Sequence, residues 1–396
     1  MLENALKGSP KYWGWIGVLL IVIVAGFLFY LRQVEFGLGI TGMSRDVNWG
    51  FYIAQFTFLV GIAASAVMVV LPYYLHNYIV FGKITILGEF LAISSVVTCI
   101  LFVTVDLGQP QRAINIILYP SPRSMLFWDM VVLIGYFLLN VVISRVTLDA
   151  EGKSISPPGW IRPVIYLSIP WAISIHTVTA FIYCGLGGRS FWLSAILAPR
   201  FLASAFASGP ALLILLCLLV RKVTRFDPGK EPIQKLALIV TYAMTANVFF
   251  ILLECFTTFY SGIPEHTIHF RYLFLGVAGA DALTPWIWVS VVMGVAGLVL
   301  LLVPRLRENE PVLTISCLAV FISLWIDKGL SMVITGFVPS PLGEFTEYTP
   351  TIPELTISLG IYAIGALLLT GLFKIGVKVK EETNRPPVLV SKARSG

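Results

Sequence analysis

Long runs of apolar residues, separated by short polar segments, dominate the chain. A helix needs about 20 predominantly apolar residues to cross the hydrocarbon core of a bilayer. Strands of a membrane barrel would instead show short segments of alternating polarity. The pattern therefore predicts an all-α integral membrane protein. Its ten predicted transmembrane helices cover 13–31, 49–72, 84–106, 124–147, 163–186, 202–222, 233–261, 285–303, 312–336 and 354–375.

The eighth of these helices has the least obvious start. The apolar run from Arg271 to Val303 is too long for one simple span. Thr284 followed by Pro285 is typical of a helix cap and a first-turn proline. We therefore start the helix at Pro285 and expect 271–283 to form an interfacial segment.

Composition agrees with a membrane location. The chain has 396 residues, of which 57% are hydrophobic and 12% are charged. Its mean hydropathy is +0.88. Soluble domains carry about 25% charged residues, so this class is excluded. The first apolar run lacks a small-residue cleavage site and is longer than the apolar core of a signal peptide, so we expect it to remain as the first helix.

Positive charge is distributed unevenly between the two sides of the predicted membrane. Most of the 27 lysines and arginines fall on the side that carries both chain ends, and the loops of the other side contain no lysine. Cytoplasmic loops are enriched in Lys and Arg, so both termini are predicted to be cytoplasmic. This asymmetry explains the net charge of +6, and we infer no binding of nucleic acid.

Several ionisable residues interrupt the apolar runs. A charge at the bilayer centre costs at least about 2.5–3.5 kcal/mol, so such residues are candidates for functional sites. Counting along each predicted helix places most of them in the outer half of the membrane, and only Glu89 lies near the inner end. The group comprises Glu89, Asp129, His176, Glu254, Asp327 and Lys328.

Structural explanations compete with a functional one for these residues. Asp129 could cap its helix or pair with Arg123 or Arg112, and His176 could be an ordinary hydrogen-bonded histidine. Glu254 and Lys328 lie at similar depth and could form one ion pair. Adjacent residues point about 100° apart on a helix, so Asp327 and Lys328 should not pair with each other.

Metal and haem sites have little support in the sequence. The five cysteines are dispersed singly over five helices, without the spacing of an iron–sulfur cluster or a covalent haem. Of the four histidines, only His176 lies well inside a predicted helix. His266 and His269 are expected in an outer loop, where we predict no metal site. The chain should therefore carry neither a haem nor an iron–sulfur cluster.

A quinone is the ligand that best matches these features. Its ring needs a hydrogen-bond partner at each carbonyl, and its reduction moves two electrons and two protons. A carboxylate and an imidazole, such as Asp129 and His176, can exchange those protons. Since the chain has no redox cofactor of its own, the electrons would require a partner subunit on the outer side.

Several motifs carry a resemblance to a known family. The segment from Asp46 to Gly61 resembles the opening of the quinone-interacting bundle in the NrfD/PsrC family, the membrane subunits of polysulfide reductase and its relatives. Further similar segments follow in the family's order: Asp106-Leu-Gly108-Gln-Pro110-Gln-Arg112, Ser121-Pro-Arg-Ser-Met-Leu-Phe-Trp128-Asp129, Ser174-Ile-His176-Thr177, Gly187-Gly188-Arg189 and Pro199-Arg200-Phe201.

The number of predicted helices, ten, and the motifs in the last third of the chain indicate which branch of the family the sequence resembles most. Asp327-Lys328-Gly329 and the segment from Gly336 to Gly343 are most similar to the DsrP branch, the membrane subunits of the DsrMKJOP sulfate-respiration complex. The HmcC branch is second. Some family members have a tyrosine as a quinone ligand on the helix that here carries His176.

The resemblance implies a function in a respiratory complex. Family members exchange electrons between menaquinone and an extracytoplasmic ferredoxin-like iron–sulfur subunit. In the DsrP branch, the further partners would be a multihaem cytochrome c and a second membrane subunit with a cytoplasmic iron–sulfur partner. The implied organisation is an N-terminal helix and outer loop (1–48), a quinone-type four-helix bundle (49–200), a second bundle (201–353) and a last helix with a basic tail (354–396).

Residue roles follow as hypotheses. The quinone-binding residues are predicted to be Asn48, Trp49, Tyr52, Gln55, Asp129, His176 and Thr177. Proton transfer is assigned to Asp129, His176, Glu89, Glu254, Asp327 and Lys328. Docking of the outer subunit is assigned to Asp106, Arg112, Arg189 and Arg200, all expected at the outer rim. Two other classes stay open: a secondary transporter or ion pathway, which ten helices with buried charges also fit, and a purely structural membrane anchor.

Overall fold

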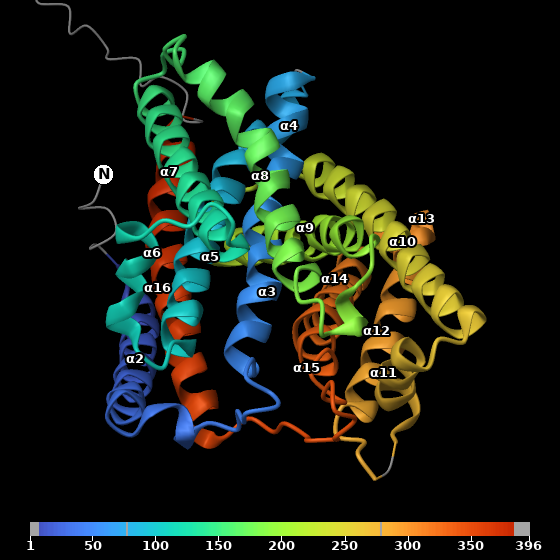
Figure 1. Ribbon diagram of the computed structural model, residues 1–396. Helices are drawn as coiled ribbons and strands as arrows, with labels where there is room; N and C mark the ends of the chain where they lie inside the picture. Colours follow the sequence, from blue (N-terminus) through green and yellow to red (C-terminus); the bar gives the residue numbers. More distant parts are fainter. Residues whose placement is uncertain (1–7, 77, 278, 384–396) are drawn as a thin grey trace, which may run out of the picture.

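A computed structural model describes residues 8–76, 78–277 and 279–383, and this part of the chain is almost entirely helical (Figure 1). Ten of its helices are long and apolar enough to cross a membrane, which confirms an all-α, multi-pass membrane protein. The spans are α2 (Pro10–Phe36), α3 (Phe51–Ala64) with α4 (Val67–Leu75), α5 (Thr85–Asp106), α7 (Met125–Gly152), α8 (Ile161–Cys184), α9 (Leu197–Val223), α10 (Lys230–Ser261), α12 (Thr284–Leu302), α14 (Glu310–Leu324) with η5 (Trp325–Ser331) and α15 (Met332–Thr335), and α16 (Ile352–Thr383). The predicted tail beyond residue 383 lies outside the described residues.

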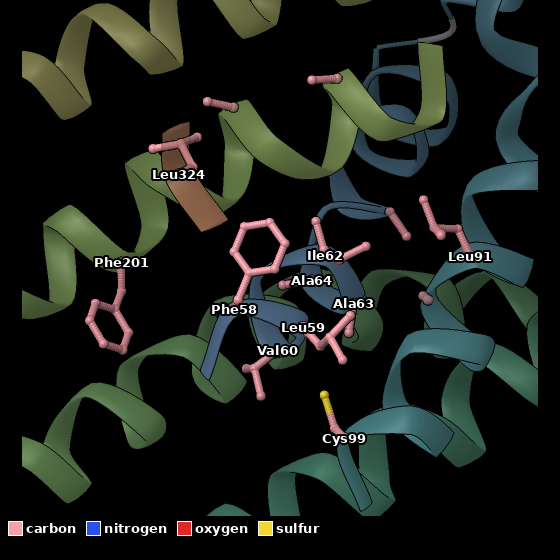
Figure 2. Packing of buried hydrophobic residues seen from close by; sticks show 14 of the residues in the cluster. Phe58, Leu59, Val60, Ile62, Ala63, Ala64, Leu91, Cys99, Phe201 and Leu324 are labelled. Atoms are coloured by element: carbon pink, nitrogen blue, oxygen red, sulfur yellow. The ribbon is translucent and has the colours of Figure 1, made fainter. Parts of the chain in front are cut away.

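Helix α3 is the centre of the molecule. All fourteen of its residues are buried, as expected for a helix that is apolar on every face. Figure 2 shows its side chains Phe58, Leu59 and Ile62 surrounded by residues of other helices, among them Leu91 and Cys99 of α5, Phe201 of α9 and Leu324 of α14. Residues on α3 therefore contact both halves of the chain.

The first and last spans lie side by side, α2 in blue and α16 in red in Figure 1. Gly26 and Gly360 allow this close contact, since a Cβ atom added to Gly26 would lie 2.8 Å from the Cα of Gly360. Small residues commonly permit such backbone approach between membrane helices. Helix α16 also packs on α5, and Gln33 of α2 donates to the carbonyl of Val105 on α5, so both ends of the described chain contact α5.

The second half of the chain packs α9, α10, α12 and α14 together. Ser290 of α12 and Ser323 of α14 each donate a hydrogen bond to the other's carbonyl oxygen, both at 2.8 Å. The segment 336–351 then crosses the end of the molecule to reach α16 (Figure 1).

Three local features differ from the expectations. The second span is interrupted after Ala64, where Ser65 donates to the carbonyl of Ile62 and competes with the regular helix ladder. The first residues of the segment 271–283, which we expected to be interfacial, form the last turn of helix α11 (Pro264–Leu275). Thr284 is the first residue of α12 and donates to the carbonyl of Tyr272 instead of capping the helix.

The orientation of the chain in the membrane is directly testable. In a variant without the five native cysteines, Arg112→Cys in the predicted outer loop should react with a membrane-impermeant maleimide in intact spheroplasts. Lys153→Cys should react only after permeabilisation, because positively charged loops stay inside. The reverse labelling pattern would contradict a cytoplasmic location of the termini.

Candidate functional site

Asp129 is held between α7 and α8. It is 6% exposed and accepts a hydrogen bond of 2.7 Å from the Thr179 hydroxyl. The two helices approach closely because Gly135 leaves room for Trp171, whose indole donates to the carbonyl of Val132 at 2.9 Å. A buried carboxylate with a neutral partner is therefore built into this helix pair.

His176 lies about one helical turn before Thr179, towards the N-terminal end of α8. Its side chain is fully buried; neither ring nitrogen makes a hydrogen bond of normal geometry with a described residue, and the backbone of Gly61 on α3 lies close to the imidazole. His176, Thr179 and Tyr183 share one face of α8, since residues three and four apart are neighbours on a helix. The Tyr183 hydroxyl hydrogen-bonds that of Thr57 on α3, so this face is directed into the first half of the chain.

Lys328 enters the same region from the other half. It belongs to the π-helical turn η5, a feature that is frequent at functional sites. Its ammonium group is buried, donates to the carbonyl of Phe201 at 3.3 Å and lies 4.5 Å from the centre of that ring. Gly61 makes room for it, because a Cβ at this position would lie 3.2 Å from Nζ.

Arg200 occupies a different place from the outer rim where it was predicted. Its side chain is 11% exposed and binds Glu254 at 2.5 Å and Asp327 at 2.7 Å. The expected ion pair of Glu254 with Lys328 is also wrong, since Arg200 of α9 supplies the cation. This triad joins the sixth, seventh and ninth spans, and Asp327 and Lys328 point to different partners as expected.

Tyr52 and Gln55 are already engaged by other helices. The Tyr52 hydroxyl donates to Gln33 of α2 at 2.7 Å. The side-chain oxygen of Gln55 accepts from the Trp325 indole at 2.7 Å and from the Tyr362 hydroxyl at 2.6 Å. Only the Gln55 amide nitrogen remains without a partner among the described residues. These two side chains therefore contact α2, η5 and α16, whereas Asp129 contacts α8.

The remaining predicted quinone ligands are spread over three environments. Trp49 packs against Tyr183, Trp192 and Phe337, with ring centres 5.5–6.1 Å apart. Asn48 is exposed in the segment before α3. Thr177 lies off the buried face of α8 and donates to the carbonyl of Ile173 in its own helix. Trp49 alone of these three contacts the buried face of α8, through Tyr183.

Glu89 lies near the opposite end of the membrane span. It is 1% exposed, and neither carboxylate oxygen has a partner among the described residues. Nearby, Lys380 pairs with Glu151 at 2.6 Å. The structure thus places buried ionisable groups both near the N-terminal end of α5 and between α7 and α8.

Comparison with known protein families assigns the chain to one of them. The family described as Polysulphide reductase, NrfD, matches residues 39–338. The chain belongs to the NrfD family. The matched range includes every residue of the Asp129, His176 and Arg200 environments described above, which places these polar groups within the part of the chain that defines the family.

Relatives of this NrfD chain are similar over nearly their whole length. A putative dimethyl sulfoxide reductase membrane subunit of Halobacterium salinarum is 27% identical over 90% of this chain and 89% of its own. An Hdr-like menaquinol oxidoreductase integral membrane subunit of Archaeoglobus fulgidus is 23% identical, over 94% and 93%. The menaquinone reductase integral membrane subunit of Nitratidesulfovibrio vulgaris is 22% identical, over 91% and 90%. These relatives are membrane subunits of redox complexes.

The other residues predicted to dock a partner differ in exposure. Arg112 is exposed on the short helix η3 (Pro110–Ile114). Arg189 is partly covered: it lies 4.5 Å from the Phe337 ring centre and donates to the carbonyls of Phe337 and Asp46, both at 3.4 Å. Asp106 ends α5 and is half-buried. Arg112 is therefore the most accessible residue of this group.

His269 lies in α11, not in an exposed loop. It is 5% exposed, and its Nδ1 is 2.9 Å from the carbonyl oxygen of Val338 and 3.0 Å from that of Thr335. Burial lowers the pKa of His269 below its ordinary value. Its position is explained by these contacts, which tie α11 to the end of α15.

A buried hydrogen-bond network at the start of α16, called the Glu354 node below, joins Glu354 to Tyr348 and to the backbone of Phe51. It was not predicted from the sequence. Glu354 is fully buried and accepts from the backbone of Gly42 at 2.7 Å and of Thr351 at 2.9 Å. Burial and this carboxylate raise the pKa of Tyr348, whose hydroxyl donates to Glu354 at 2.7 Å. The Tyr348 oxygen accepts from the backbone N–H of Phe51 at 2.8 Å. The node thus satisfies the first residue of α3.

Removing one hydroxyl tests this node. Tyr348→Phe leaves the Phe51 N–H and one oxygen of Glu354 without partners, which should cost about 1–3 kcal/mol. We expect a lower midpoint in thermal unfolding of the purified protein. The matched control is Tyr119→Phe, because Tyr119 is 77% exposed. Equal midpoints for Tyr348→Phe and the control would show that the node does not stabilise α3.

Proposed function

We propose that this chain is the membrane subunit of a menaquinol-linked oxidoreductase complex. In this function it exchanges electrons between menaquinol and an extracytoplasmic iron–sulfur subunit. The observation that carries the proposal is the buried Asp129 carboxylate with its single neutral partner, Thr179, in a chain of the NrfD family. Two relatives that are named for menaquinol or menaquinone support the choice of ligand.

The quinone head is proposed to bind at the face of α8 that carries His176, Thr179 and Tyr183. Neither ring nitrogen of His176 makes a hydrogen bond of normal geometry with a described residue, and the nitrogen that does not face the Gly61 backbone would hold a quinone oxygen. Asp129 would accept a proton from the bound quinol, because a carboxylate within hydrogen-bond reach is a suitable general base. Trp49 contributes an aromatic wall beside Tyr183. Tyr52 and Gln55 support the start of α3 through their existing bonds.

Menaquinone supplies the two-electron chemistry when it is bound. The protein's own residues orient the head, exclude water and take up protons. Of the other groups assigned to proton transfer, Glu89 and Lys328 have no oppositely charged partner within 4 Å among the described residues. Glu254 and Asp327 are both already bound by Arg200. We therefore assign proton transfer first to Asp129 and His176.

The partners follow from the same proposal. Electrons would leave outward to a ferredoxin-like iron–sulfur subunit that docks near Arg112, Asp106 and Arg189. Arg200 is no longer assigned to docking, since its side chain is only 11% exposed and is bound to Glu254 and Asp327. We further propose a sulfate-respiration complex of the DsrP type, with a multihaem cytochrome c and a second membrane subunit that has a cytoplasmic iron–sulfur partner. The motifs of the last third of the chain support this branch.

Purification of the complex from cells tests the proposed function. Menaquinol should reduce the iron–sulfur clusters of the associated subunits, as seen in their electron paramagnetic resonance spectra. A complex without this chain should lose that reduction. If the remaining subunits still oxidise menaquinol, the chain is an anchor. If the chain alone transports a solute into liposomes, the transporter class is favoured.

A further inference from the structure

A mainly apolar cavity with a few polar residues in its wall lies away from Asp129, in the other half of the molecule. Its volume is about 260 Å³, and it is enclosed by α9, α10, α12 and α14 with α11 at one end. Ligand pockets usually measure about 300–1,000 Å³, so this cavity accommodates one or two fused rings without a long tail. The roles proposed above do not require a cavity here.

Hydrogen-bonding groups without partners line the inner part of this cavity. Asn247 is fully buried, and neither its amide nitrogen nor its oxygen has a partner among the described residues. One carboxylate oxygen of Asp327 and the hydroxyl of Ser331 are also buried without a hydrogen-bond partner among the described residues. All three residues line the cavity. Unpaired buried polar groups are costly, so a ligand or water should satisfy them.

The outer part of the cavity faces lipid. Its lining includes Leu252, Trp288 and Val295, which are 63%, 49% and 52% exposed on spans of the membrane. Phe270 and Phe274 add aromatic walls. A molecule that enters from the hydrocarbon therefore meets apolar surface first and polar groups afterwards.

Depth and charge restrict the class of ligand. Asn247 is fourteen residues from the end of α10 at Ser261, which corresponds to about 21 Å along the helix. Its distance from the other end of α10 at Lys230 is seventeen residues, or about 26 Å, so this amide lies near the middle of the span and away from both head-group regions. Arg200 with Glu254 and Asp327 carries one more carboxylate than cations, which disfavours an anionic ligand.

We propose that this cavity binds the ring of a second quinone or quinol, independently of the site at Asp129. In the quinone form, a ring carbonyl would accept from the Asn247 amide N–H; in the quinol form, a ring hydroxyl would donate to the free oxygen of Asp327. The ring would rest against Trp288 and Phe270 while its tail lies in lipid. Only the choice of a quinone among neutral lipid-soluble rings rests on the proposed function.

Photolabelling of the purified complex in nanodiscs tests this site. The probe is an azido-naphthoquinone with a short alkyl tail. We expect labelled peptides from α10 and α12 around Asn247 and Trp288, in addition to peptides from α7 and α8. Absence of label on α10 and α12 in the wild-type complex would overturn the proposal. This result does not depend on the folding of any variant. It would then imply that water or another subunit fills the cavity.

Two variants separate the sites. Asn247→Leu should reduce labelling of α10 and α12 about tenfold, since buried hydrogen bonds are lost, while labelling of α7 and α8 persists. Asp129→Asn should leave the α10 and α12 label unchanged. The control is Thr241→Val on the same helix, because Thr241 is buried but bonds only the carbonyl of Ala237. If Asn247→Leu labels like this control, the proposal fails, whatever the result for menaquinol oxidation.

Discussion

Replacing Asp129 by asparagine is expected to lower menaquinol oxidation by the purified complex by about 100-fold or more, the usual contribution of a positioned general base. Asparagine has nearly the same shape and can still accept the hydrogen bond from Thr179. It cannot take up a proton. The effect should therefore fall on the turnover number, with a smaller change in the KM for menaquinol.

The control for this variant lies on the same helix. Thr147 bonds the carbonyl of Ile143 within α7, and Thr147→Val should retain normal turnover. His176→Gln, which removes the imidazole, should also lower turnover. If Asp129→Asn and Thr147→Val oxidise menaquinol equally fast, Asp129 is not the proton acceptor.

The second large effect concerns stability. Arg200→Met should destabilise the protein by about 3–5 kcal/mol, the usual cost of breaking a buried ion pair from one side. The substitution keeps an apolar stem of similar length but leaves Glu254 and Asp327 as uncompensated charges, each 9% exposed at the side chain. A large fall in the thermal unfolding midpoint and in the amount of protein in the membrane should follow.

Two further variants identify the cause. Arg123→Met removes an exposed arginine and should leave the midpoint unchanged. Adding Glu254→Gln and Asp327→Asn to Arg200→Met removes the unpaired charges and should restore most of the lost stability. A triple variant as unstable as Arg200→Met would show that the packing of Arg200, not its charge, stabilises this region.

The ten spans were predictable because the apolar runs are long and clearly bounded. The predicted first and last residues of the helices were less accurate, and one such error led to a wrong placement of Arg200. The sixth span was predicted to begin at residue 202, whereas α9 begins at Leu197. Arg200 therefore lies inside the helix, in contact with α10 and η5, and the prediction of a rim residue was wrong. Ion pairs with Glu254 and Asp327 hold Arg200 within the first turn of this helix.

The candidate site was predictable in part. The sequence indicated that Asp129 and His176 lie at related depths on neighbouring helices, and the helical period places His176 and Thr179 on one face. The direction of Tyr52 and Gln55 was not predictable, since helix α3 is buried on every side. Their partners, Gln33, Trp325 and Tyr362, come from distant parts of the sequence. The same holds for Glu354 and Asn247, which belong to no motif.

A cryo-electron microscopy map of the complex with bound menaquinone tests the central claim most directly. We expect density for a quinone head within hydrogen-bond distance of Asp129 or His176, near the outer ends of α7 and α8. If such density is found only near Glu89 at the inner side, or if Asp129 and His176 contact only protein, the assignment of the quinone site to these two residues is contradicted.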